Sequence, residues 1–194
     1  MKQFANIISY LFIPPVNLLL IFIFMSLKIY DDPELQIKTI SLAAILGFAI
    51  PIMVFVFFRL KSEIVDNDAS IRSERTKPYI IGVALSILGA MLSMLFELHP
   101  FIVALWLSYF VCSSILVIVN NYLKISAHAI GIAIPFAVLV FIFGNYGYYF
   151  FILVFAISWA RVYQKLHTLT QVLAGLSIGI FVTFLILNWS LRLV

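Results

Sequence analysis

The sequence predicts an all-α, polytopic integral membrane protein: a helical bundle of six or seven transmembrane helices. Three observations support this fold class. Hydrophobic residues make up 64% of the 194 residues and charged residues only 10%, with a mean hydropathy of +1.17. The apolar residues gather into long runs, most of which are long enough to cross the roughly 30 Å hydrocarbon layer of a bilayer. Short polar stretches separate these runs, as expected for loops at two membrane surfaces.

Seven apolar runs correspond to the predicted helices. They cover residues 7–27, 40–58, 79–96, 101–123, 129–143, 148–159 and 169–189. The first four and the last are long enough to span alone, and the fifth and sixth suffice if each helix extends into its polar flank, at 126–128 and 161–164. Pro14, Pro15 and Asn17 interrupt the first run, and we expect them to kink or divert it.

The connections between the runs differ in length and charge. Residues 97–100 and 144–147 form predicted tight turns between antiparallel helices, and residues 30–38 form a predicted polar loop. Residues 59–77 form the one long polar connection, with both signs of charge. The N-terminal run has no small-x-small cleavage pattern, so we interpret it as a retained anchor rather than a signal peptide.

Three polar segments are predicted to share one membrane face. The long connection 59–77, the junction 124–128 and the junction 161–168 are separated by one helical hairpin each. Because a hairpin returns the chain to the face that it left, the three segments lie on the same side whatever the path of the first run. Ionisable groups near a span cost roughly 2.5–3.5 kcal/mol on insertion scales, so we expect the function at this face.

The composition excludes several functions. The net charge of +4 is spread thinly, without the dense basic stripe that nucleic acid requires. Anionic lipid headgroups or phosphorylated substrates are better partners for these cations. The single cysteine, Cys112, excludes an intrachain disulfide and a cysteine zinc site, and we expect it to be a small core residue. His99 lies in a tight turn on the opposite face and is expected at the surface.

The long connection ends in a cluster of cations. Arg72, Arg75 and Lys77 fall within six residues, and Pro78 suits the first turn of the next helix, which places the cations at a helix entrance. Such a cluster can hold phosphate oxygens. The structural alternative is a solvated loop in which the charges pair with one another, for example through Glu74.

The second segment contains Ser126 and His128. Serine is a good N-cap, and the free N–H groups of a helix start favour an anion. The structural alternative is a capping serine beside an interfacial histidine.

The third segment contains Arg161, His167 and Gln171. His167 and Gln171 are four residues apart and therefore on one helical face, where the amide can bond one imidazole nitrogen and direct the other to a substrate. A histidine that accepts a phosphoryl group needs this orientation and nearby cations. Arg161 directly follows an apolar run, so much of its stem is expected to be buried. The structural alternative is a charged loop at the membrane surface.

These motifs resemble those of the type 2 phosphatidic acid phosphatase superfamily, in its integral membrane branch. Ser126-x-His128 resembles the second signature, P-S-G-H, and Arg161-x5-His167-x3-Gln171 resembles the third, S-R-x5-H-x3-D. The segment 72–78 matches the first signature, K-x6-R-P, only loosely. The resemblance extends from residue 59 to the C-terminus.

The resemblance implies a metal-independent phosphatase without a cofactor, which hydrolyses a lipid or polyprenyl phosphate or pyrophosphate through a phosphohistidine intermediate. His167 would be the nucleophile, His128 the general acid and Gln171 the residue that orients His167. The residues implied to hold the phosphate oxygens are Arg161, Ser126, Arg72, Arg75 and Lys77.

The chain is accordingly interpreted as one membrane domain, 1–194, with N-terminal spans at 1–58 and a phosphatase-like core at 59–194. The expected location is the bacterial inner membrane. The positive-inside rule places the cation-rich motif face in the cytoplasm. Members of the family commonly act on the outer face, so both assignments stay open.

The sequence departs from the family signatures at several positions. Ile125, Ala127 and Ala160 stand where the family has Pro, Gly and Ser. The first-signature lysine falls on Ser70 if Lys77-Pro78 takes the place of R-P. Gln171 replaces an aspartate, and an amide does not stabilise an imidazolium as a carboxylate does. A comparable change in a catalytic triad costs up to ~10⁴-fold in rate.

Four interpretations of the chain stay open at this stage. It is a slow enzyme, an enzyme with a compensating carboxylate from Glu74 or Asp68, or an inactive homologue that binds lipid phosphates. The fourth is an intramembrane prenyltransferase, because Asn67-Asp68 before Lys77-Pro78 faintly resembles the acidic motif of that class. Prenyltransferases need a second Asp-rich cluster, which the sequence does not place on this face.

Overall fold

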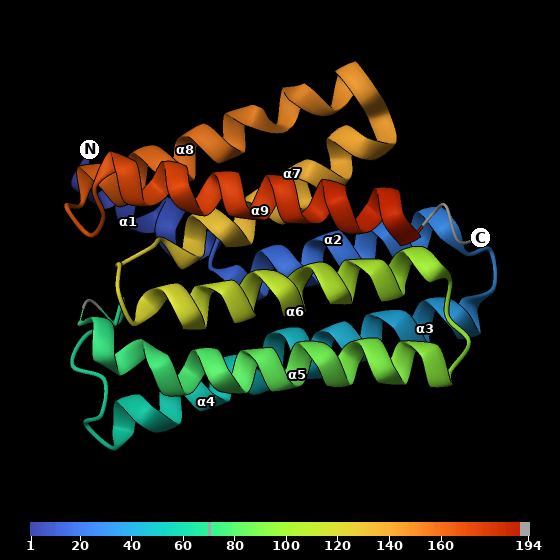
Figure 1. Ribbon diagram of the computed structural model, residues 1–194, viewed down its shortest axis with the longest axis horizontal. Coiled ribbons are helices and arrows are strands. Elements are labelled where there is room, and N and C mark those ends of the chain that lie inside the picture. Colours follow the sequence, from blue (N-terminus) through green and yellow to red (C-terminus); the bar gives the residue numbers. More distant parts are fainter. Residues whose placement is uncertain (70, 191–194) are drawn as a thin grey trace.

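The computed structural model describes residues 1–69 and 71–190, and every regular element within these ranges is a helix. The elements are α1 (Lys2–Leu11), α2 (Pro14–Ile29), α3 (Pro33–Leu42), the π-helical η1 (Ala43–Ala49), α4 (Ile50–Leu60), the 3₁₀ turn η2 (Arg72–Arg75), α5 (Thr76–Leu95), α6 (Pro100–Asn120), α7 (Ala127–Phe143), the 3₁₀ segment η3 (Gly144–Phe150), α8 (Phe151–Tyr163) and α9 (Leu169–Ser190). Most of the helices run along one long axis, and the chain turns at the two ends (Figure 1).

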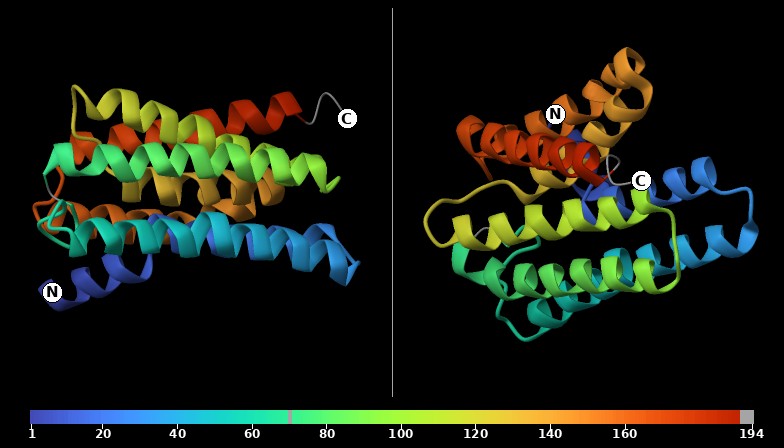
Figure 2. Two further views of the ribbon diagram at one scale, coloured as in Figure 1. Left: turned by 90° about the horizontal axis from the view of Figure 1, so that it is seen from below. Right: turned by 45° about the vertical axis from the view of Figure 1, so that its right-hand side comes forward.

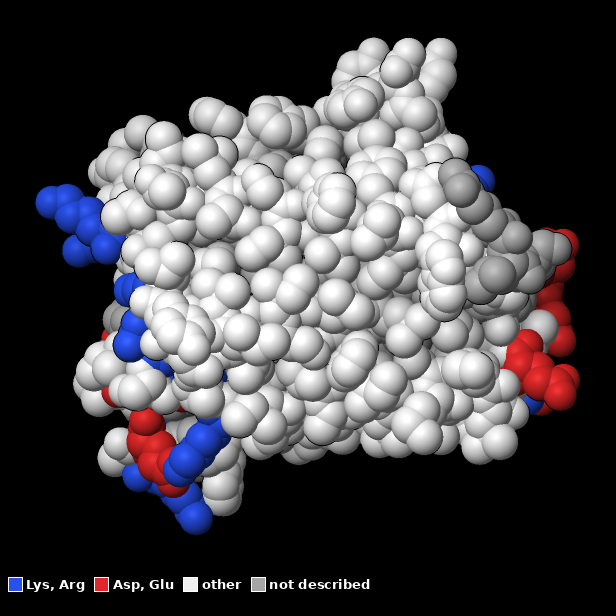
Figure 3. Space-filling model, viewed as in Figure 1, with Lys and Arg blue, Asp and Glu red and all other residues white. Residues whose placement is uncertain are grey.

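The helices have the length and polarity of membrane spans. Five helical segments of the described chain are long and apolar enough to cross a membrane, or six if the bent pair α1 and α2 counts as one. Charged side chains gather at the two ends of the molecule and leave an uncharged belt between them (Figure 3). α9, with 22 residues, is about 33 Å long and matches the hydrocarbon layer. The predicted all-helical membrane fold is confirmed at this level.

The first apolar run bends where its prolines lie. α1 ends at Leu11, α2 begins at Pro14, and the two axes differ by 52°. Pro14 has no N–H with which to continue α1, but its fixed φ suits the first turn of α2. Asn17 Nδ2 donates to the carbonyl of Phe12 at 3.0 Å, which satisfies an acceptor at the break. The predicted kink is confirmed.

The second span begins earlier than predicted, because residues 30–38 are mostly helical rather than a loop. The Asp32 side chain accepts the N–H of Glu34 at 2.9 Å and caps α3, whose first residue is Pro33. Lys38 then pairs with Glu34 at 2.6 Å, one turn along. Hydropathy detects only the apolar part of a helix, whereas these local polar contacts extend it by two turns.

The later helices follow the predicted hairpins. Glu97 adopts a φ of +52° in the turn between α5 and α6, and Gly144 ends α7 with a φ of +56°. The second turn is longer than predicted, since η3 continues from Gly144 before α8 returns antiparallel to α7 (Figure 1). Glycine suits position 144 because a side chain disfavours positive φ.

The core lies between α2, α5, α6 and α7. Trp106 is fully buried and packs against Phe22, with ring centroids 4.6 Å apart. A Cβ on Gly89 would lie 2.5 Å from the Trp106 ring, so the glycine allows α5 and α6 to approach closely. Cys112 is buried in the same core and His99 is exposed, as predicted for both.

The three polar connections meet at one end of the bundle. The described parts of the three connections, residues 61–69, 121–126 and 164–168, lie together at the same end as the N-terminus (Figures 1 and 2). The common face predicted from hairpin parity is therefore confirmed, and it brings the candidate residues within reach of one another.

Candidate active site

A cavity of about 430 Å³ opens at this end of the bundle and extends between the helices. This volume is typical of small-molecule sites, which span roughly 300–1,000 Å³. The charged and histidine side chains that line it come from distant parts of the chain. They are Asp68, Arg75, His128, Arg161 and His167.

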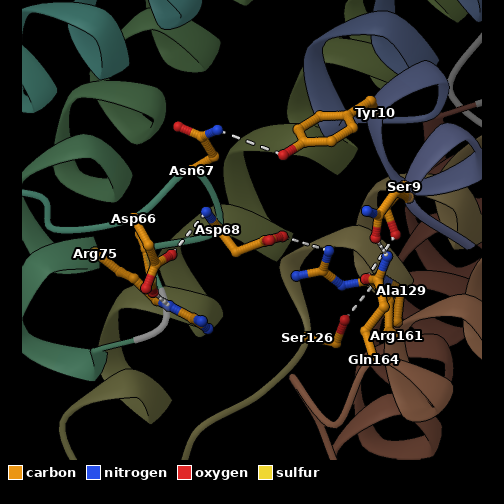
Figure 4. A network of polar contacts seen from close by, with 12 residues as sticks. Ser9, Tyr10, Asp66, Asn67, Asp68, Arg75, Ser126, Ala129, Arg161 and Gln164 are labelled. Atoms are coloured by element: carbon orange, nitrogen blue, oxygen red, sulfur yellow. Dashed lines mark hydrogen bonds and ion pairs between the residues drawn. The ribbon is translucent and has the colours of Figure 1, made fainter. Parts of the chain in front are cut away.

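Arg161 is the most deeply buried of these charges. It lies in the last turn of α8, and its side chain is 1% exposed. Its Nη1 donates to Asp68 Oδ1 at 2.6 Å, and the two groups point toward each other in Figure 4. Its Nε has no hydrogen-bond partner among the described residues. A buried guanidinium with an unpaired N–H is costly, so this donor is suited to an anionic ligand.

Arg75 places a second guanidinium in the same cavity. It ends the 3₁₀ turn η2 and is only 3% exposed. Its Nε donates to the carbonyl of Ala69, and its side chain also bonds Tyr79, while its Nη2 has no partner within the described chain. Two arginines from different segments thus line one cavity, and each has one buried N–H donor without a partner among the described residues.

His167 has an orientation that its neighbours determine. Gln171 Oε1 lies 3.1 Å from His167 Nδ1 and also accepts the backbone N–H of Thr168 at 3.3 Å. Because a backbone N–H can only donate, the shared amide atom is an oxygen, and Nδ1 of His167 must carry the proton. Nε2 is therefore the nitrogen with a free lone pair. The contact predicted between His167 and Gln171 is confirmed, but the shared helical face is not, because α9 begins at Leu169, after His167.

His167 is neutral at physiological pH. Burial lowers its pKa to about 3, with further contributions from Arg75 and Arg161, although the bond to Gln171 acts in the opposite direction. The residue is 5% exposed. A neutral imidazole beside two cations is the form that a nucleophile requires.

His128 lies in the first turn of α7 and faces the same cavity as His167. Its imidazole has a hydrogen bond with the backbone of Ser9, from the C-terminal half of α1. Ser126 is the N-cap of α7, and its hydroxyl accepts the N–H of Ala129 at 3.3 Å. The Ser126 side chain is fully buried and does not line the cavity, so it orients the helix that carries His128.

Two predicted phosphate-binding cations lie outside the cavity. Arg72 Nη1 donates to the carbonyl of Tyr122 at 2.8 Å, and Lys77 pairs with Glu63 at 2.5 Å on the exposed surface. Of the three clustered cations, Arg75 is the one that lines the cavity. Ser70, on which the family's lysine would fall, lies outside the described residues.

The two candidate compensating carboxylates do not bond His167. Asp68 binds Arg161, and Glu74 Oε2 accepts the backbone N–H of Val65 at 3.2 Å. Within the described chain, the group at His167 Nδ1 is the neutral amide of Gln171. Neither Asp68 nor Glu74 therefore takes the place of the aspartate that the resembled signature has at position 171.

The sequence analysis missed the contribution of the first spans. Tyr10, Pro14 and Leu18 line the cavity, and Tyr10 accepts a hydrogen bond from Asn67 at 3.4 Å (Figure 4). Tyr10 lies within the first apolar run, where nothing in the sequence distinguishes it from a lipid-facing aromatic residue. The boundary drawn at residue 58 therefore does not separate the N-terminal spans from the site.

The rest of the cavity wall is mostly apolar and extends between the helices into the uncharged belt. It includes Leu18, Gly47, Pro51, Ile81, Tyr109 and Ile134. Tyr109 precedes the last residue of α6, Asn120, by three helical turns, which places it about 16 Å deeper than the polar end. A ligand with a charged head and an apolar tail matches this division.

The described residues contain no group of three or more His, Cys, Asp or Glu side chains placed to hold a metal ion. The chain matches no protein-family model, no curated protein and no solved structure. The function is therefore argued from the geometry of this cavity.

Proposed function

We propose that this protein is a metal-independent membrane phosphatase, which hydrolyses a lipid or polyprenyl phosphate or pyrophosphate through a phosphohistidine at His167. One observation carries the proposal. Two buried guanidinium groups with unpaired N–H donors and two histidines line a single cavity whose remaining wall is mostly apolar. Arginine donors suit phosphate oxygens, and the neutral imidazole supplies the nucleophile.

The proposed reaction has two balanced steps. In the first, Nε2 of His167 attacks phosphorus, the bond from phosphorus to the lipid oxygen breaks, and His128 donates its proton to that oxygen. In the second, water attacks the phosphohistidine, the N–P bond breaks, and His128 accepts the proton of the water. Arg75 and Arg161 stabilise the charge on the phosphoryl oxygens in both steps. His167 also borders an open surface depression with Lys124 and Lys165, which gives the site an aqueous side.

The proposal extends to the membrane topology. α7 and α8 run antiparallel, so each is counted as one crossing, and the bundle has six or seven spans in all. The substrate phosphate would lie at the polar end and its tail in the apolar part of the cavity. We assign the protein to a bacterial inner membrane. A reporter fused at residue 194 would determine which face carries the active site.

The decisive experiment compares His167→Ala with His99→Asn. Phosphate release is measured from detergent micelles that contain phosphatidic acid, phosphatidylglycerol phosphate or a polyprenyl pyrophosphate, with and without EDTA. We expect His167→Ala to abolish release, whereas His99→Asn keeps it, because His99 caps α6 at the opposite end and asparagine is also a good cap. Full activity in His167→Ala rejects the nucleophile. Loss of the wild-type activity in EDTA favours a prenyltransferase-like, metal-dependent enzyme.

A second candidate is a lipid-phosphate-binding protein without catalysis. Gln171 favours it, because the amide at His167 Nδ1 does not stabilise the positive charge that develops on the imidazole. This candidate expects inorganic phosphate or a lipid phosphate to bind, with no phosphate released from the lipid on long incubation.

A further inference from the structure

The carboxylate of Asp68 forms an ion pair with Arg161, one of the two arginines proposed to bind phosphate. The carboxylate lies 2.6 Å from Arg161 Nη1, and both residues line the cavity. The two partners differ in their freedom to move, since the Arg161 side chain is 1% exposed and the Asp68 side chain is 27% exposed. Arg161 is held in the packed end of α8, so the carboxylate is the partner that can turn away.

The backbone at Asp68 is fixed independently of this ion pair. Asp66 Oδ1 accepts the N–H of Asp68 at 2.8 Å, and Asn67 bonds both Tyr10 and Arg59. The Asp68 side chain can therefore rotate toward the surface while its loop stays in place. Displacement of the carboxylate requires no rearrangement of the helices.

The charge of the cavity depends on this rotation. Apart from the two histidines, the formally charged lining residues in the described chain are Arg75, Arg161 and Asp68. These three side chains sum to +1 with the carboxylate on Arg161, and departure of the carboxylate adds one positive charge to the site that meets the ligand. A phosphate monoester is close to a dianion at neutral pH, whereas a phosphodiester is a monoanion. The monoester therefore gains more than the phosphodiester from the open form of the cavity.

We propose that Asp68 is a specificity-determining residue, whose carboxylate neutralises Arg161 until a phosphate monoester displaces it and thereby excludes phosphodiester lipids. The inference rests on the proposed function, because it defines which lipid phosphates reach the site. Such a device is useful at a membrane interface, where phosphodiester headgroups are the most abundant anions. Two uncovered guanidinium groups would bind those headgroups and block the cavity.

Asp68→Asn is the informative variant, and Glu63→Gln is its matched control. Both remove one negative charge from the same connection, but Glu63 pairs with Lys77 outside the cavity. Inorganic phosphate is titrated calorimetrically into each full-length protein in mild detergent. Without the competing ion pair, Asp68→Asn should bind phosphate roughly 10- to 100-fold more tightly than the wild type. Glu63→Gln should bind within about twofold of the wild type. Equal or weaker binding by Asp68→Asn overturns the inference.

A second measurement has a wild-type arm, which does not depend on the folding of the variant. Phosphate release from phosphatidic acid micelles is followed while the fraction of phosphatidylglycerol, a phosphodiester lipid, is raised. We expect little inhibition of the wild type and strong inhibition of Asp68→Asn. Strong inhibition of the wild type overturns the exclusion of phosphodiesters. If the wild type releases no phosphate at all, the proposed phosphatase fails, while the calorimetric comparison still decides the role of Asp68.

Discussion

The neutral partner of His167 offers a direct gain-of-function test, the substitution Gln171→Glu. Glutamate has the shape of glutamine, so its carboxylate can accept the same two N–H groups, from His167 Nδ1 and from Thr168. The change adds one negative charge at 3.1 Å from the imidazole. It should stabilise the positively charged phosphoimidazole that the proposed first step forms.

The size of the effect follows from the distance. Two unit charges 3.1 Å apart attract by about 5 kcal/mol at an effective dielectric constant of about 20. This interaction would raise the pKa of His167 from about 3 to near neutrality. The rate should rise by at least tenfold and at most by the ~10⁴-fold that separates a carboxylate from an amide in a catalytic triad.

The assay is kcat for phosphate release as a function of pH, on mixed micelles of the best substrate. Gln171→Glu should raise kcat at neutral pH. In this variant kcat should also fall on the acid side of about pH 7 as His167 takes up a proton, whereas titration of His167 causes no such fall near pH 7 in the wild type. Gln3→Glu is the control, because it adds the same charge at an exposed position on α1, at the same end of the bundle. An unchanged rate and an unchanged profile in Gln171→Glu would refute the proposed role of the Gln171 contact.

Two further predictions test the cations and the burial of His167. Arg75→Gln should weaken the binding of inorganic phosphate by roughly 10- to 100-fold, because it removes a charge-assisted donor from the cavity. Arg72→Gln and Lys77→Gln should leave the calorimetric affinity for phosphate within about twofold of the wild type. Equal losses of affinity in all three variants would contradict the geometry. His167 stays neutral in the folded protein down to about pH 3 but takes up a proton near pH 6.5 when unfolded. The free energy of unfolding should therefore fall as the pH is lowered from 6.5, by about 2 kcal/mol between pH 7 and pH 5 from this residue. Denaturant unfolding in detergent should show this loss in the wild type and not in His167→Gln, and the same pH dependence in both would argue against a lowered pKa.

The N-terminal helices contribute to the candidate site although no motif in the sequence indicates it. α1 and α2 carry no signature, yet Ser9 bonds His128, and Tyr10 and Pro14 line the cavity. The 52° bend between the two helices brings α1 against α8, where Ser9 Oγ donates to Gln164 Oε1 at 3.1 Å. The prolines predict the bend, but its direction depends on the helices against which α1 packs.

The sequence alone determined the helical membrane fold and the face on which the site lies. Both follow from the bilayer, since it requires long apolar helices with satisfied backbone groups and forces each hairpin to return to its starting side. The contact of His167 with Gln171 was likewise local, because the two residues lie four positions apart, although His167 precedes the first residue of α9, Leu169.

Only the tertiary structure decided which of the clustered cations line the cavity. Arg72, Arg75 and Lys77 are equivalent in the sequence, but the 3₁₀ turn η2 and the start of α5 direct Arg75 inward and leave Arg72 and Lys77 at the surface. The pairing of Asp68 with Arg161 joins residues 93 positions apart. The direction of a side chain at a turn depends on the helix phase and on distant packing partners, and neither is present in the local sequence.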